Sequence, residues 1–154
     1  KYFRLFPGNE VRLKSAYYVT CNSYDTDENG EVTCLHCTYD PESRGGNSPD
    51  GRKVKGTIHW VSAEGSFKAT VNMYDRLFNV PNPSDESTGS FKDNLNPDSL
   101  KVLTGCLIES GLKNVKPGDV FQFMRKGYFC VDKNSTCDNI IFNLTVPLNS
   151  SWGK

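Results

Sequence analysis

The sequence predicts an all-β fold, a sandwich or a barrel, from two observations. Turn signals recur at short intervals along the chain, as at Pro7-Gly8, Pro49-Asp-Gly51 and Pro117-Gly-Asp119. The segments between the turns are mostly of strand length and are rich in Val, Thr, Tyr and Phe. Short strands separated by frequent turns are typical of small all-β domains.

Residues 10–19 are the first predicted strand, after a turn at residues 7–9. Its side chains alternate, with Val11, Leu13, Tyr17 and Val19 on one face and Arg12, Lys14, Ala16 and Tyr18 on the other. A strand would hold Arg12 and Lys14 side by side, where they could bind phosphates or base edges. An ordinary solvated strand face explains the alternation equally well.

The rest of the chain supplies further strands. Two are predicted at residues 17–24 and 31–40, joined by an acidic loop, and others at 53–62, 99–107, 120–132 and 140–148. Residues 71–80 are predicted to form either a strand or a short helical turn. Gly56 lies inside one of them, which suggests a bulge or a close backbone approach. Residues 81–96, rich in Pro, Ser and Asp, are the best candidate linker. The strand pattern starts again after them, so the chain is expected to divide into residues 1–80 and 81–154.

Charge is balanced over the chain but unevenly distributed. The chain has eighteen Lys and Arg residues and eighteen Asp and Glu residues, so its net charge does not indicate a nucleic-acid partner. Residues 1–20 are nevertheless basic, residues 24–51 are acidic, and residues 52–55 are basic again. Such asymmetry suits a surface that attracts RNA on one side and repels it on the other.

No membrane span, signal peptide or transit segment is recognisable, so the chain is expected to be soluble. Its start at Lys1, directly before a strand-like segment, suggests a fragment of a longer protein.

Six cysteines leave two interpretations open. Most of them lie in apolar strand patterns, which favours reduced thiols that act as small hydrophobic residues. Their even number and three Asn-X-Ser/Thr acceptor patterns support the alternative, a secreted, disulfide-bonded β module that binds a glycan or a protein. Cys34-Leu-His-Cys37 lacks a second ligand pair, so no metal site is expected. The sequence also lacks a phosphate loop and a nucleophile motif, so the chain is predicted to be non-catalytic.

Four blocks carry a resemblance to a known family. They are Gly8-Asn-Glu-Val-Arg-Leu-Lys-Ser-Ala-Tyr17, Arg52-Lys-Val-Lys-Gly-Thr-Ile-His-Trp-Val-Ser62, Tyr74-Asp-Arg-Leu-Phe78 and Gly127-Tyr-Phe-Cys-Val-Asp132. In this order they resemble the C-terminal anticodon-binding region of the glutaminyl-tRNA synthetase family, over nearly the whole chain. A chance match to one block is conceivable, but not to four in series.

The resemblance implies two small β-barrels of the anticodon-binding type, the distal one mainly in residues 1–80 and the proximal one mainly in 81–154. It implies a parent class I aminoacyl-tRNA synthetase, a ligase that attaches glutamine to its tRNA. That reaction uses ATP and Mg²⁺ in a separate catalytic domain. The present residues would bind the anticodon loop of tRNA(Gln) without a cofactor of their own. A cytoplasmic monomer without membrane contact is expected.

The resemblance also assigns base-reading residues. Arg4 matches an arginine that reads the third anticodon base, Arg12 and Lys14 match two arginines at the first base, and Gln122 and Arg125 match residues that serve the middle base. Lys14 departs from the family pattern, because lysine offers a point charge in place of a planar fork and reads a base edge less specifically.

The alternation of side chains along a strand limits how Gln122 and Arg125 could both contact the middle base. Gln122 and Arg125 are three residues apart, so they would face opposite sides of a regular strand. A bulge or turn within residues 124–127 is needed if both are to reach one base. Otherwise Gln122 reads the base while Arg125 holds a phosphate.

Overall fold

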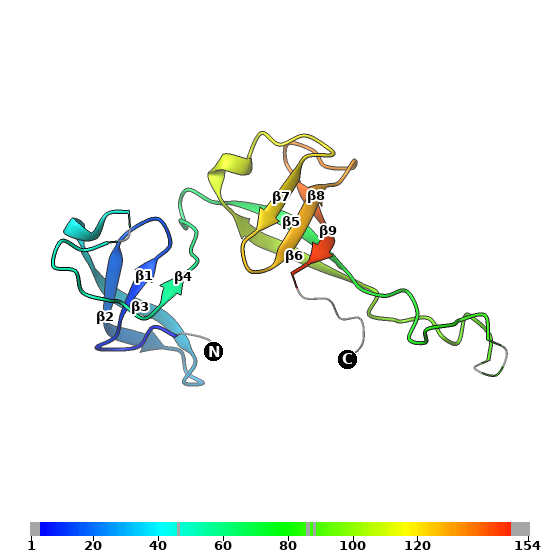
Figure 1. Cartoon of the computed structure of the whole chain (residues 1–154), viewed down its shortest axis with the longest axis horizontal. Coiled ribbons are helices and arrows are strands. Elements are labelled where there is room, and N and C mark those ends of the chain that lie inside the picture. The colour runs from blue at the N-terminus through cyan, green and yellow to red at the C-terminus, as the bar shows by residue number, and fades with distance from the viewer. Residues whose placement is uncertain (1–3, 46, 86, 88, 149–154) are drawn as a thin grey trace. The chain divides into compact units, whose positions relative to one another are not determined.

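The protein is all-β in the residues that this computed structural model describes, which are 4–45, 47–85, 87 and 89–148 (Figure 1). This confirms the predicted fold class. The described residues contain no α-helix, and so none that is long and apolar enough to cross a membrane.

The chain divides into two compact units, residues 1–60 and 61–154, earlier than the predicted boundary between residues 80 and 81. The reason is the pairing of β5 (Phe67–Tyr74), which lies between β6 (Leu100–Ile108) and β9 (Ile141–Pro147). The expected linker, residues 81–96, instead connects β5 to β6 within the second unit. The segments that follow β5 and precede β6 run side by side, since Phe78 and Leu95 form a β-bridge (Figure 1).

The first unit holds a four-stranded sheet in the order β3-β2-β1-β4. Its elements are β1 (Glu10–Leu13), β2 (Tyr18–Thr26), β3 (Val32–Asp40), the 3-10 turn η1 (Pro41–Ser43) and β4 (Thr57–Ile58). The strand predicted at residues 53–62 is thus reduced to two residues, which pair in parallel with β1. The amide of Arg12 donates to the carbonyl oxygen of Gly56 at 2.8 Å, just before β4.

The first predicted strand, residues 10–19, is in fact a tight hairpin. The chain reverses at residues 14–16, where Ser15 has a φ of 58°, and Arg12 then pairs with Tyr18 across β1 and β2. Lys14 therefore lies in the turn and does not project from a strand beside Arg12. The sequence did not predict this turn, because its positive-φ position is occupied by Ser15 and not by glycine. A non-glycine residue with positive φ is uncommon, so serine is not a turn signal there.

The second unit holds a five-stranded sheet in the order β6-β5-β9-β8-β7. The 3-10 turn η3 (Ser110–Leu112) follows β6, and β7 (Val120–Phe123) and β8 (Gly127–Val131) form a hairpin. The prediction of one strand over 120–132 was therefore wrong, whereas those at 99–107 and 140–148 correspond closely to β6 and β9. Both sheets are open over the described residues, with β3 and β4 at the edges of one and β6 and β7 at the edges of the other.

Aromatic packing organises the core of the second unit. Phe142 is 0% exposed, and its ring lies edge-on to those of Phe121 and Phe123, at 6.4 Å and 5.0 Å between centroids. Phe123 also stacks on the buried Phe129 at 4.3 Å. Because alternate residues of a strand point to opposite faces, the inward Phe121 and Phe123 leave Gln122 on the outer face.

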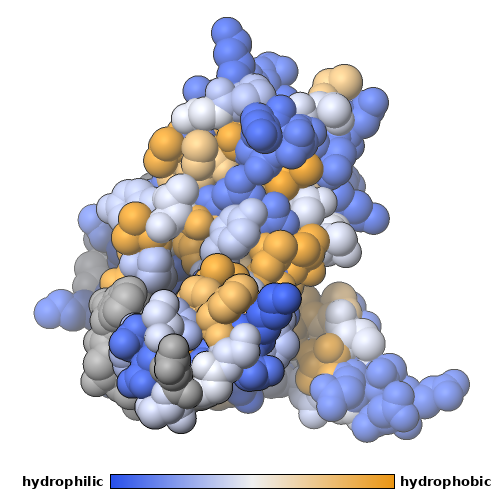
Figure 2. Space-filling view, turned by 90° about the vertical axis from the view of Figure 1, so that its right-hand side faces the viewer, coloured by the Kyte–Doolittle hydropathy of each residue, from blue (hydrophilic) through white to orange (hydrophobic). Residues whose placement is uncertain are grey.

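Apolar side chains also reach the surface of the second unit, among them Leu100, Val102, Leu107 and Val120. On the face seen in Figure 2, apolar groups occur in patches interrupted by hydrophilic ones. Scattered exposure of this kind is normal in folded proteins and does not by itself indicate an interaction surface.

Candidate nucleic-acid interface

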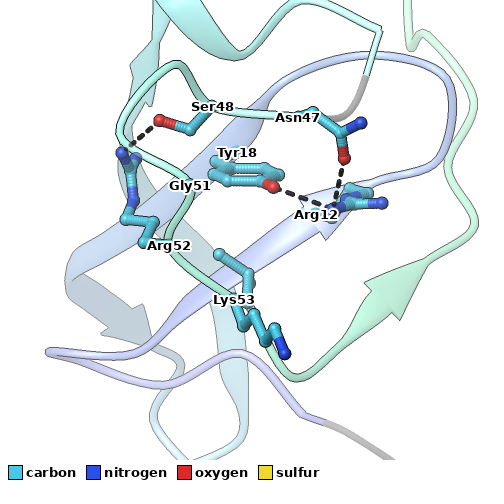
Figure 3. A pocket seen from close by; sticks show the side chains of 8 residues that line it. Arg12, Tyr18, Asn47, Ser48, Gly51, Arg52 and Lys53 are labelled. Atoms are coloured by element: carbon cyan, nitrogen blue, oxygen red, sulfur yellow. Dashed lines mark hydrogen bonds between the residues drawn. The ribbon is translucent and has the colours of Figure 1, made fainter.

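An open pocket of about 580 Å³ lies in the first unit, where the loop after η1 crosses the hairpin of β1 and β2 (Figure 3). Its lining includes Arg12, Tyr18, Asn47, Ser48, Arg52 and Lys53. Three of these residues are cations, so the pocket could accept a polar, electron-rich ligand such as a base edge or a phosphate. Of the predicted residues, Arg12 lines it, whereas Arg4 and Lys14 do not.

Tyr18 forms the floor of the pocket. It is 1% exposed, and its amide nitrogen donates to the hydroxyl of the buried Ser43 at 2.8 Å. The guanidinium carbon atoms of Arg12 and Arg52 both lie 5.1 Å from the centroid of its ring, a distance at which a cation is attracted to the ring electrons. The ring thus sets the position of two cations that are far apart in sequence.

Arg52 is fully engaged by carboxylates. Its Nε and Nη2 donate to both oxygens of Glu10 at 3.0 and 2.9 Å, and the same guanidinium contacts Asp40 at 2.5 Å and Asp50 at 2.6 Å. The hydrogen bond with Glu10, followed by those with Asp40 and Asp50, raises the pKa of Arg52. Arg52 therefore joins the loop to β1 and has little charge left to offer a ligand.

This cluster also corrects the expected charge distribution. Asp40 and Asp50 belong to the acidic segment 24–51, which was expected on the side that repels RNA, but they converge with Glu10 on the cation Arg52. Glu10 lies on β1, Asp40 at the end of β3 and Asp50 in the following loop. Their convergence cannot be seen in the sequence.

Arg12 is held differently. Its Nη2 donates to the Tyr18 hydroxyl at 2.8 Å and to Oδ1 of Asn47 at 3.4 Å, both neutral acceptors. Its Nε is buried and has no hydrogen-bond partner among the described residues. A positive charge held by neutral groups is not cancelled by a carboxylate partner, so it is suited to an acceptor from a ligand.

Acid should loosen this loop through Asp50. The hydroxyl of Ser48, followed by the amide and guanidinium of Arg52, lowers the pKa of Asp50 from 3.8 to about 2. Because the folded-state pKa is depressed, this stabilisation is complete above pH 3.8 and is lost as the pH falls toward 2. We expect Asp50→Asn to reduce the fall in melting temperature across this range. Parallel curves for the variant and the unaltered chain would contradict the contribution of Asp50.

Arg4 and Lys14 lie outside the pocket. Arg4 is exposed and precedes the turn at residues 7–8, which is tied to β2 by a 2.9 Å hydrogen bond from the amide of Gly8 to the carbonyl of Cys21. The carbonyl of Lys14 accepts the indole N–H of Trp60 at 3.0 Å. Of the three cations predicted in the first unit, the pocket therefore includes only Arg12.

Gln122 and Arg125 lie on the hairpin of β7 and β8 in the second unit. Gln122 is exposed on β7, and Arg125 is exposed in the turn of residues 124–126 with a φ of 62°. The turn that parity required is thus present. A non-glycine residue in the left-handed region is uncommon and is often found at functional sites.

Sequence reasoning missed several residues that the fold adds to these sites. Tyr18, Asn47 and Ser48 join the first, and Tyr128 lies directly opposite Gln122 with 41% of its surface exposed. Tyr128 could have been found by pairing positions across a turn at residues 124–126. No comparable signal points to Asn47 or Ser48, because their loop is placed by contacts with distant strands.

All six cysteines are free in the structure. Cys34 lies with Asp25 and His36 on the β2–β3 hairpin, the one group in the described part of the chain whose donor atoms are close enough to hold a metal ion.

Comparison with known proteins gives a consistent result over the whole chain. Residues 2–40 and residues 57–132 each match a family described as class I tRNA synthetases (E and Q), anti-codon binding domain. The chain is 54% identical to glutamine–tRNA ligase of Rhodopirellula baltica over 155 residues, covering 100% of this chain and 26% of that protein. The glutamine–tRNA ligases of Pseudomonas putida and Clostridium perfringens are 51% and 52% identical, each over 99% of this chain and 27% of the relative. The chain thus spans about a quarter of the length of these relatives.

Proposed function

The chain belongs to the anticodon-binding region of the class I tRNA synthetases for glutamate and glutamine, and from this we propose that it binds the anticodon loop of tRNA(Gln). The parent protein would be a glutamine–tRNA ligase that acts as a monomer in the cytoplasm. It would join glutamine to its tRNA with ATP and Mg²⁺, through parts of the relatives that this chain does not cover.

In this proposal the three anticodon bases are splayed and read separately. Arg4 reads the third base, Arg12 with Lys14 reads the first, and Gln122 with Arg125 serves the middle one. Unstacked RNA bases offer flat faces for stacking and Watson–Crick edges for hydrogen bonds, which suits arginine and amide side chains set beside tyrosines.

The contrast between two arginines carries the proposal. Arg52 donates to three carboxylates, whereas the hydrogen-bond partners of Arg12 are the neutral Tyr18 and Asn47. An RNA acceptor would therefore find an uncompensated guanidinium at Arg12. Its planar fork can bond two acceptors of one base edge at once.

The middle base has support of the same kind. Gln122 is presented outward because its neighbours Phe121 and Phe123 pack inward, and Tyr128 stands opposite it on β8. An amide next to an exposed ring can bond a base edge while the ring stacks on the base. Arg125, in the adjoining turn, is suited either to the same base or to a phosphate.

Binding of RNA hairpins tests the function. Hairpins with the glutamine anticodon should bind more tightly than hairpins with one anticodon base changed, by about 1–3 kcal/mol per base if the scale of duplex readout applies. The measurement is fluorescence anisotropy at several salt concentrations. Equal affinity for all anticodons would rule out base reading by this chain.

Lys53→Ala is the matched electrostatic control. Lys53 lines the pocket and is exposed, and we assign it to general attraction of the RNA backbone. The variant should bind every hairpin more weakly by a similar factor, and the slope of log affinity against log salt should fall by about one. A selective loss for the cognate hairpin would instead make Lys53 a base-reading residue.

A further inference from the structure

The outer part of the β2–β3 hairpin carries three metal-ligand side chains that anticodon binding does not use. Asp25 comes from β2 and Cys34 and His36 come from β3, and all three are exposed. One donor atom from each lies within 4.8 Å of the other two. His36 Nε2 is 2.8 Å from Asp25 Oδ2, so two of the three already touch.

A β-bulge brings the three residues to one face. Cys21 pairs with Cys37, but the next pair is Ser23 with His36, so Asn22 is the extra residue. Beyond the bulge Asp25 pairs with Cys34, and His36 follows Cys34 by two residues on the same face. In an unbroken ladder Asp25 would point to the opposite face, with Cys21. The bulge therefore creates the cluster.

The donor set selects a class of metal. Thiolate and imidazole ligands favour zinc and similar divalent transition ions, whereas Mg²⁺ and Ca²⁺ prefer oxygen alone. Ligand atoms around a tetrahedral zinc ion are about 3.3–3.8 Å apart, as follows from metal–ligand bonds of about 2.0–2.3 Å. The three donor atoms lie within 4.8 Å of one another, so small rotations of these exposed side chains would bring them to such distances.

We propose that Asp25, Cys34 and His36 form a three-ligand site for a zinc-like divalent ion, which clips the end of the β2–β3 hairpin. Water would complete the coordination shell, as in other sites with three protein ligands. Cys37 is not part of the site, because residues three apart on a strand face opposite sides. The ion would hold together a hairpin end that is exposed on both strands.

Metal titration of the reduced 154-residue chain tests the site. Zn²⁺ should bind with one equivalent per chain, and Co²⁺ should give thiolate-to-metal charge-transfer absorption. Cys34→Ser and His36→Gln should each weaken binding by about 10–100-fold or more, since even a supporting residue outside the ligands costs that much. Cys137→Ser is the control, because Cys137 is an exposed thiol in the second unit.

Hydrogen exchange gives a second readout that does not depend on RNA binding. Zn²⁺ should slow exchange of the amides of β2 and β3 around Ser23–Asp25 in the unaltered chain and not in Cys34→Ser. The proposal is overturned if less than one equivalent binds, if Cys34→Ser binds as tightly as the unaltered chain, or if one ion joins two chains in sedimentation.

Discussion

Replacing Phe142 with Ala is expected to lower the free energy of unfolding of the second unit by about 3–5 kcal/mol. Phe142 is fully buried on β9, contacts the rings of Phe121 and Phe123, and pairs with Val71 and Val131 on the neighbouring strands. The substitution would leave a cavity among rings that cannot all move to fill it, so the loss of packing adds to the loss of burial.

Native-state hydrogen exchange measures this loss in one unit at a time. Amides of β8 and β9 should exchange faster in the variant, while those of β1 and β2 in the first unit should not change. Phe91→Ala is the matched control, since Phe91 is 54% exposed and the same side-chain atoms are removed. A similar change in both variants would mean that Phe142 is not central to the core.

Replacing Arg12 with Ala is expected to reduce discrimination at the first anticodon base by about ten- to a hundredfold, the equivalent of a lost bidentate contact of about 1–3 kcal/mol. The variant loses the guanidinium beside Tyr18 that we propose as the base-reading group. Arg12→Lys should restore part of the overall affinity but little of the discrimination, because an ammonium group has no planar fork. The measurement is kcat/KM of the full-length enzyme with tRNAs altered at single anticodon bases.

Arg4→Ala supplies the reciprocal control for that experiment. It should reduce discrimination at the third base and preserve it at the first, whereas Arg12→Ala should do the reverse. If Arg12→Ala left the ratio for cognate and first-base-altered tRNAs unchanged, Arg12 could not be the residue that reads the first base. If both variants weakened all tRNAs equally, both arginines would act on the RNA backbone alone.

Local patterns predicted much of the fold because strands and turns depend largely on residues that are close together in the sequence. The strands β6 and β9 were placed to within a residue or so at each end, and the outward position of Gln122 follows from Phe121 and Phe123 on either side. The β1–β2 hairpin was missed, and the turn between β7 and β8 was expected only as a condition on Gln122 and Arg125. Ser15 and Arg125 take positive φ angles that glycine usually occupies, so neither turn has a local signal. The unit boundary was misplaced for another reason: a Pro- and Ser-rich stretch can be a long connection within one sheet as easily as a linker.

The turn and strand patterns were enough to predict an all-β protein, and four motifs in order indicated the family that it resembles. The partners of each arginine could be read only from the folded chain. Arg12 and Arg52 both lie in basic segments, but Glu10, Asp40 and Asp50 converge on Arg52 and leave Arg12 with neutral partners. Alternation along a strand sets the face on which a side chain lies, whereas its charge partners come from other strands and loops that pack against it.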